Sequence, residues 1–444
     1  MLKGLMMMER VVPKILPGMM ELLPEDQILF NQMYDKIRKV YERFGYLPLD
    51  TPVLEYSSVL LAKAGGETEK QIYRFNKGDN DISLRFDLTV PLARYASQRY
   101  NELVFPFKRY QMGKVYRGER PQRGRFREFY QCDIDVIGED LSLVYDAEIP
   151  SVIYELFKEL NFGKFTIRIN NRKILNGFFE ALNLKDKSSD VLRIIDKLEK
   201  IGIEEVRNEL KELNVSIENI NKIEEFINIK GNNDEVLASL KALNIENKLF
   251  DEGLSDMTSV VENIRTFGIE EDYFTIDLTI ARGLDYYTGT VYETKLDDYP
   301  ALGSVCSGGR YDNLTGYYTD KALKGIGISI GLTRLFYQLK EAGIISSKEK
   351  SLLKALIIPF DKNNMKYAIK TAKELRKNEI VCDIYYEDKN LKQKLKYANR
   401  LNVPYICLIG EEEEKEGKVT LKNMETGEQE KISLENLSNK LKQD

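Results

Sequence analysis

The chain has 444 residues, which favours two or three domains, because a single core seldom grows beyond about 250–300 residues. It has 43% hydrophobic and 31% charged residues and no apolar run of bilayer length, a composition typical of a cytoplasmic globular protein with no membrane segment. The chain contains no histidine, which excludes every mechanism that uses a protein imidazole and every histidine-ligated metal.

The cysteines indicate core thiols. Cys132, Cys306, Cys382 and Cys407 lie far apart and fit no zinc-ligand spacing, so we expect reduced, buried side chains and no structural zinc.

The first predicted element is a long amphipathic helix. It begins at Pro24, has Glu25 and Asp26 in its first turn, and ends at Gly45. The prolines of the following segment, 46–52, predict an edge strand or an extended stretch. Residues 82–94 alternate polar and apolar side chains, which predicts a strand with one polar face. Asp87 on that face either binds an ammonium group or simply meets solvent.

Residues 106–137 form the most cationic part of the chain. Two alternating runs flank a loop at 121–124, which predicts an antiparallel hairpin with an arginine-lined loop. Guanidinium groups on both arms suit a phosphate chain, although a basic surface hairpin would have the same pattern. The stretch carries Lys108, Arg109, Lys114, Arg117, Arg120, Arg123, Arg125 and Arg127 against Glu119 and Glu128.

A helix over 145–160 and a strand over 165–170 come next, and residues from about 180 to 255 have the composition of an acidic helical insertion. The strand pattern resumes at Tyr273. Gly283 and Gly289 break the strand pattern, and Arg282, Asp285, Tyr286 and Tyr287 cluster at that break, which suits a small polar ligand or an aromatic core pair. Glycine-rich stretches at 304–314 and 325–339 allow close approach of the backbone to a flat ligand. The second stretch lacks the glycine spacing and the βαβ unit of a dinucleotide fingerprint.

A mixed-charge linker at 341–351 precedes a C-terminal domain over 352–444. Strands at 355–359, 381–386 and 405–409 alternate with helices at 363–378 and 391–402, which predicts a parallel or mixed α/β domain. Its second helix carries a basic set that faces either a nucleic-acid backbone or solvent, namely Lys389, Lys392, Lys394, Lys396 and Arg400. Glu411–Glu416 is predicted to be a solvated hairpin loop.

Together these segments resemble the class II aminoacyl-tRNA synthetases, and within them the histidyl-tRNA synthetase family. The first helix with GYLPLDTP is similar to motif 1, VYRGE with RFREFYQ to motif 2, and GIGISIGLTRL to motif 3. The most specific matches are RGLDYYTGTVYE from Arg282 and CSGGRYDNL from Cys306, which resemble the two histidine-enzyme motifs. The resemblance covers nearly the whole chain.

The resemblance implies an α+β fold: an antiparallel-sheet catalytic domain over 1–340 with its helical insertion, and an α/β anticodon-binding domain over 352–444. It implies a homodimer through motif 1. It also implies the activation of histidine with ATP and Mg²⁺ and transfer to tRNA(His), with no zinc and no organic cofactor.

The resemblance also implies residue roles. Arg117 and Arg282 would be catalytic and would contact both substrates. The other implied histidine contacts are Asp87, Leu88, Thr89, Gln131, Asp135, Tyr286 and Tyr287. The other ATP contacts are Glu119, Arg125 and Arg334, and the tRNA contacts are Arg120, Gln122 and Arg123. Thr333 stands where the family usually has an acid, so the metal ligands stay unassigned.

Two alternatives remain at this stage. One is the synthetase-like, histidine-sensing regulatory subunit of ATP phosphoribosyltransferase, whose members lack the anticodon domain and have degraded motif 2 arginines, whereas this chain retains both. The other is a synthetase for a different amino acid, against which the RGLDYY sequence argues.

Overall fold

The computed structural model describes residues 11–62, 67–120, 123–280, 287–313, 315–347 and 349–443. The chain divides into two compact units. The first comprises the residues up to Met20 together with Tyr34–Ile344, and the second comprises Glu21–Met33 with Ile345–Asp444. No helix in the described part of the chain is both long and apolar enough to cross a membrane.

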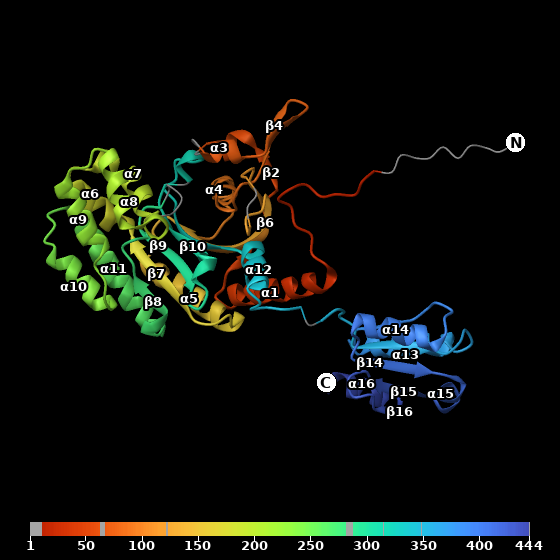
Figure 1. Cartoon of the computed structure of the whole chain (residues 1–444). Helices are drawn as coiled ribbons and strands as arrows, with labels where there is room; N and C mark the ends of the chain where they lie inside the picture. Colours follow the sequence, from red (N-terminus) through yellow and green to blue (C-terminus); the bar gives the residue numbers. More distant parts are fainter. Residues whose placement is uncertain are drawn as a thin grey trace. The chain divides into compact units, whose positions relative to one another are not determined.

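An eight-stranded sheet is the centre of the first unit (Figure 1). The β1·β5 and β7·β8 pairs at its two edges are parallel, and all other neighbours are antiparallel. Its three middle strands come from the arginine-rich hairpin and from both glycine-rich stretches, which the chain brings together from far apart. In spatial order the strands are β1 (Leu47–Pro48), β5 (Phe107–Tyr116), β6 (Glu128–Gly138), β11 (Lys324–Gly331), β10 (Ser304–Tyr311), β9 (Thr290–Leu296), β7 (Phe165–Asn171) and β8 (Phe274–Ile276).

Helices cover one face of this sheet. Tyr41, in the second half of α1 (Pro24–Arg43), donates its hydroxyl hydrogen to the Cys132 carbonyl at 3.0 Å. Tyr292 of β9 donates to the Asp146 carbonyl in α5 (Val144–Leu160) at 2.7 Å. Asp146 also forms a buried ion pair with Arg310 of β10. These buried polar contacts fix the helices against the sheet and leave its other face for a ligand. The helix α12 (Leu332–Glu341) follows β11 directly.

The expected strand over 82–94 is wrong beyond Leu84. The chain leaves β4 there and enters the helix α4 at Thr89, because the Asp87 carboxylate accepts hydrogen bonds from the Thr89 and Val90 amides at 3.1 and 2.9 Å and so caps the helix. The segment belongs to a small layer made of β2 (Leu54–Tyr56), β4 (Asn80–Leu84), β3 (Arg74–Lys77), α2 (Ser57–Leu60), α3 (Glu67–Gln71) and α4 (Thr89–Gln98).

The segment expected to be a helical insertion is helical. Its first and last helices pack closely, since a Cβ added at Gly177 of α6 would lie 2.4 Å from the Phe250 amide nitrogen of α11. The elements are α6 (Arg172–Ala181), η1 (Lys185–Lys187), α7 (Ser188–Ile195), α8 (Leu198–Glu212), α9 (Ile217–Ile227), α10 (Asn233–Ala242) and α11 (Lys248–Thr266). Three further short turns are η2 (Glu271–Tyr273), η3 (Pro300–Leu302) and η4 (Thr315–Tyr317).

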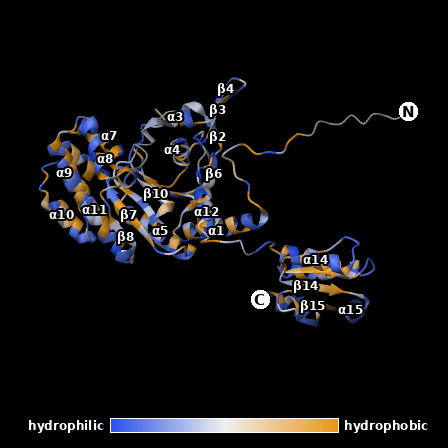
Figure 2. Cartoon of the chain, viewed as in Figure 1, coloured by the Kyte–Doolittle hydropathy of each residue, from blue (hydrophilic) through white to orange (hydrophobic). Residues whose placement is uncertain are grey.

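The second unit is a mixed α/β domain, as expected. Strands β13, β12 and β14 pair in parallel, and β15 and β16 add antiparallel partners. Figure 2 shows β14 as a continuously apolar strand, and all its residues are buried. In spatial order the strands are β13 (Cys382–Ile384), β12 (Ala355–Pro359), β14 (Tyr405–Ile409), β15 (Lys418–Asn423) and β16 (Gln429–Ser433), with helices α13 (Met365–Lys377), α14 (Leu391–Leu401), α15 (Glu411–Glu416) and α16 (Leu434–Gln443).

Two expectations for this unit are wrong in detail. The acidic run from Glu411 is the short helix α15 rather than a loop, because the Glu413 carboxylate accepts hydrogen bonds from the Gly410 amide and the Thr420 hydroxyl, both at 2.9 Å. Lys394 does not belong to an open basic face of α14. Its ammonium group is buried and donates to the Pro359 carbonyl at 2.7 Å. All four cysteines are buried free thiols.

Candidate functional site

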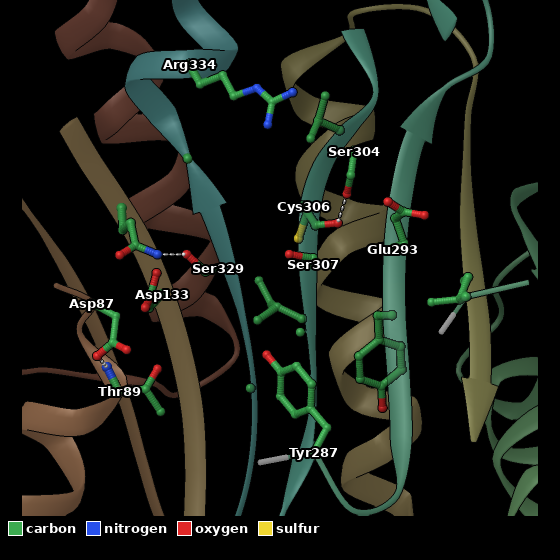
Figure 3. A pocket seen from close by; sticks show the side chains of 18 of the residues that line it. Asp87, Thr89, Asp133, Tyr287, Glu293, Ser304, Cys306, Ser307, Ser329 and Arg334 are labelled. Carbon is green, nitrogen blue, oxygen red and sulfur yellow. Dashed lines mark hydrogen bonds between the residues drawn. The ribbon is translucent and has the colours of Figure 1, made fainter. Parts of the chain in front are cut away.

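A pocket of about 850 Å³ lies on the open face of the large sheet. The middle strands of the sheet lie beneath it (Figure 3). Segments before α4 and after β5, together with α7 and α12, also line it. The pocket brings together many of the side chains that the sequence singles out. Those that line it are Asp87, Thr89, Arg117, Glu119, Arg125, Gln131, Asp135, Tyr287 and Arg334.

Strand β6 presents its polar residues to the pocket by simple alternation. Gln131, Asp133 and Asp135 share one face of the strand, while the intervening side chains are buried on the other. Across the ladder they oppose Gly331, Ser329 and Gly327 of β11. A Cβ at Gly327 would lie 2.3 Å from an Asp135 carboxylate oxygen, so the missing side chain makes room for that carboxylate.

Asp135 is held by two neighbours. It pairs with the fully buried Arg109 guanidinium at 2.5 Å, and it accepts a hydrogen bond from the Tyr311 hydroxyl at 2.7 Å. Burial raises its pKa to about 6, and the nearby guanidinium opposes that shift. Arg109 also donates to the Leu88 carbonyl at 3.3 Å. Leu88 itself is fully buried and does not line the pocket, so its only route to a ligand would be through its backbone.

Arg117 lies close to two aromatic rings. Its guanidinium carbon lies 4.3 Å from the centre of the Phe86 ring and 5.1 Å from that of Phe129. Its Nε donates to the Phe86 carbonyl at 3.2 Å. A guanidinium group whose carbon lies near aromatic rings still bonds an anion through its in-plane N–H groups, which suits a phosphate.

Further arginines reach the pocket at a distance from its acidic end. In Figure 3, Arg334 lies at the end of the pocket opposite Asp87 and Tyr287. Its Nη2 donates to the Leu302 carbonyl at 3.4 Å. Arg125 is half-exposed and lies 3.6 Å from the Glu119 carboxylate. The pocket therefore has a cationic end and an acidic end, as a ligand with a phosphate and an ammonium group requires.

Several candidates lie elsewhere. Arg120 and Arg123 are exposed and do not line the pocket, and Arg123 pairs with Glu341 at 2.7 Å. Gln122, Arg282 and Tyr286 fall outside the described residues.

Sequence reasoning missed some of the lining. Asp133 could have been found, because it shares the alternation of Gln131 and Asp135. Leu192 and Arg193 of α7 also line the pocket, and no local pattern in the insertion marked them. Thr333, at the position where an acid is usual, accepts a hydrogen bond from the Tyr130 amide at 2.8 Å and so joins α12 to β6.

An antiparallel sheet that places hairpin arginines opposite carboxylates of its middle strands defines the catalytic domain of a class II aminoacyl-tRNA synthetase. The profile described as histidyl-tRNA synthetase matches residues 18–335, and the one described as anticodon binding domain matches residues 354–444. The chain belongs to the histidyl-tRNA synthetase family, and the resemblance read from the sequence is confirmed.

Named relatives agree over their full lengths. A histidine–tRNA ligase of Clostridium tetani is 62% identical, and the match covers 96% of this chain and 97% of that protein. A histidine–tRNA ligase of Finegoldia magna is 48% identical, and the match covers 97% of this chain and 100% of that protein. The crystal structure of histidyl-tRNA synthetase from Nostoc sp. PCC 7120 matches with a TM-score of 0.90 and 40% identity, covering 98% of this chain and 100% of that one.

A structure from Bacillus halodurans titled as an ATP phosphoribosyltransferase regulatory subunit/histidyl-tRNA synthetase matches with a TM-score of 0.75 but only 21% identity, covering 90% of this chain and 100% of that one. That likeness shows a shared fold alone.

Proposed function

We propose that this chain is a histidine–tRNA ligase. The carboxylate of histidine attacks the α-phosphorus of ATP and displaces diphosphate, and the terminal adenosine of tRNA(His) then attacks the carbonyl of the adenylate and displaces AMP. The observation that carries the proposal is one pocket that is lined both by Arg117 and Arg334 and by the β6 carboxylates.

The acidic end binds the amino acid. Asp87, Thr89 and Gln131 take the α-ammonium group, while Asp135, Tyr286 and Tyr287 orient the imidazole ring, and the Leu88 backbone completes this wall. The Asp135 carboxylate, oriented by Tyr311 and Arg109, supports this role because a fixed acceptor selects a ring N–H. A pocket with such paired polar groups rejects an amino acid that lacks them, since its own groups would then be unpaired.

The cationic end binds ATP. Arg117 holds the α-phosphate, Glu119 lies near the adenine, and Arg125 and Arg334 contact the γ-phosphate and the adenine face. Arg282 stabilises the charge that develops on the α-phosphate. Mg²⁺ would enter with ATP and would help to neutralise the charge of its phosphates. No group of three potential metal-binding side chains occurs in the described part of the chain.

The tRNA contacts lie outside the pocket. Arg120, Gln122 and Arg123 of the hairpin loop approach the acceptor end, and the exposure of the two arginines supports this. The catalytic domain spans 1–340 with an insertion over about 180–255, and the linker 341–351 joins it to the anticodon-binding domain over 352–444. The protein works in the cytoplasm as a homodimer formed through α1 and residues 45–52.

An exchange assay tests this function. With purified protein, ATP and labelled diphosphate, we expect label to enter ATP only with histidine among the twenty amino acids. A histidine-sensing subunit would show no exchange with any amino acid, and a synthetase of different specificity would show exchange with another one. Either result would overturn the proposal.

A further inference from the structure

Asp133 is a buried acid with one carboxylate oxygen that has no hydrogen-bond partner among the described residues, although a hydrogen bond with Ser329 also acts on the side chain. Its side chain is 2% exposed, it lines the pocket, and its Oδ1 has no hydrogen-bond partner among the described residues. A buried carboxylate oxygen with no partner is costly, so its presence at a binding pocket points to a ligand that supplies the missing donor. The buried Oε1 of Gln131, two residues earlier on the same strand face, also has no partner there.

The neighbouring carboxylates are more fully engaged. Asp135 accepts from Arg109 and Tyr311, and one oxygen of Asp87 accepts from two amides that begin α4. Figure 3 shows Asp133 between Ser329 and Asp87, close to Thr89.

The charge balance of this end also requires a cation. Asp87, Asp133 and Asp135 lie near one another around the buried guanidinium of Arg109, and Arg117 also acts on Asp87. Burial, opposed by Arg109 and helped by Asp135 and Asp87, raises the pKa of Asp133 to about 7. An ammonium group placed here would relieve this repulsion.

We propose that Asp133 is a further substrate-binding residue, whose free oxygen accepts a hydrogen bond from the α-ammonium group of the amino acid. The ammonium group then lies between Asp87 and Asp133, and the imidazole extends towards Asp135. This inference rests on the proposed function, because it assigns a contact to the same amino acid.

The test compares two ligands that differ only in the ammonium group. Calorimetric titration measures the binding of histidine and of 3-(imidazol-4-yl)propanoate, which lacks the α-amino group, to the unchanged protein and to Asp133→Asn. We expect the substitution to weaken histidine binding by about 10- to 100-fold, the range for loss of a hydrogen bond to a charged group, and to change binding of the deaminated ligand by less than about twofold.

A matched control replaces a remote acid. Asp140 lies just beyond β6, with its side chain 98% exposed, so Asp140→Asn should bind both ligands as the unchanged protein does. Equal weakening of both ligands by Asp133→Asn would place Asp133 at the imidazole or in a structural role and would overturn the inference. Unchanged histidine binding would overturn it as well. If the unchanged protein binds no histidine, the proposed function itself fails, which is a distinct outcome.

A second measurement needs no variant. The charged groups that act on Asp133 are Asp87, Asp135 and Arg109. The thiols of Cys132 and Cys306 and the Tyr41 hydroxyl also lie near it, but their pKa values are raised, so they stay neutral at pH 7. Binding an ammonium group beside Asp133 should ionise it, so titrations at pH 7 in buffers of different ionisation enthalpy should show proton release with histidine and less with the deaminated ligand. Equal release with both would overturn the inference.

Discussion

Individual residues in this pocket combine burial with charge, and the lack of any histidine makes their protonation important. Asp133 and Asp135 have pKa values raised to about 7 and about 6, close to the range that an imidazole would otherwise occupy. Both shifts are caused mainly by burial, which disfavours the ionised form. In the described part of the site, a change of pH near 7 therefore changes the protonation of Asp133 and Asp135 at the acidic end of the pocket.

Removing the Asp133 charge should stabilise the ligand-free protein in a pH-dependent way. The raised pKa means that the folded state holds a proton that the unfolded state loses above about pH 4, so stability falls as pH rises through the window up to about 7. We expect Asp133→Asn to raise the melting temperature more at pH 8 than at pH 5, by about 2–4 °C for each kcal/mol gained.

Calorimetric or fluorescence melting at both pH values measures this effect. Asp140→Asn, the exposed control, should give no pH-dependent change. A rise of the same size at both pH values would mean that the Asp133 carboxylate is not destabilised by burial.

Arg117 is a second residue whose surroundings predict an effect. Its two aromatic neighbours hold the guanidinium in place before ATP arrives, which is the preorganisation that favours charge developing on a phosphate. We expect Arg117→Ala to lower the rate of histidine-dependent exchange by about 10²–10³-fold, the usual loss for one preorganised donor. Arg117→Lys should recover little, because an ammonium group lacks the planar fork. Exchange within tenfold of the unchanged protein would contradict the role.

At the scale of elements, local patterns predicted most of the architecture and tertiary contacts decided the remainder. The hairpin, the middle strands and the C-terminal domain follow from alternation and helical spacing. The structure of residues 82–94 could not be predicted in this way. Polar and apolar residues continue to alternate past Leu84, but the hydrogen bonds that Asp87 accepts start a helix there. Glu413 likewise turns an acidic run into α15 through contacts with Gly410 and Thr420.

The site residues that belong to sequence motifs could be predicted from the sequence, whereas those that tertiary packing brings to the pocket could not. Asp87, Arg117 and Asp135 all line the pocket, as their motifs suggested. Arg193 reaches the pocket only because the insertion folds towards it, and Lys394 leaves the basic face of α14 only because its ammonium group donates a hydrogen bond to a backbone carbonyl. Neither contact has a signal in the neighbouring sequence.

The close spacing of β10 and β11 leads to a stability prediction. A Cβ at Gly308 would lie 2.1 Å from the Gly327 carbonyl oxygen and 2.6 Å from the Ile328 Cα, and these backbone atoms have no room to move within the sheet. We expect Gly308→Ala to lower the free energy of unfolding by about 1–3 kcal/mol or more, as overpacking does. Denaturant unfolding measures this. Gly316→Ala is the control, since nothing lies within 4 Å of its added Cβ, and equal effects of the two substitutions would contradict the argument.

At the scale of the whole molecule, one edge of the large sheet carries exposed apolar residues. β1 is an edge strand, and its Leu47 is 58% exposed. Sheet edges with apolar side chains tend to pair with another chain. Because this strand belongs to the segment proposed to form the homodimer, the dimer would cover it.

We expect Leu47→Asp to shift the protein towards monomers in sedimentation experiments at micromolar concentration, because burying a charge at the interface is unfavourable. Ile217→Asp is the matched control, since Ile217 is 64% exposed on the insertion helix α9, far along the chain from this edge. A monomeric unchanged protein, or a variant that sediments as the unchanged protein does, would contradict the proposed interface.

The pairing of β6 with β11 has a consequence for how this sequence tolerates length changes. Deleting or inserting one residue within Glu128–Gly138 would turn Gln131, Asp133 and Asp135 towards the helices and present Cys132, Ile134 and Val136 to the substrate. A screen of single-residue insertions and deletions should therefore find the strand intolerant, whereas the exposed residues Arg120 and Arg123 lie in a loop whose length alters no ladder. The same residues of β6 determine both the pairing register with β11 and the side chains that face the substrate. Selection for substrate specificity therefore also preserves the register of the strand.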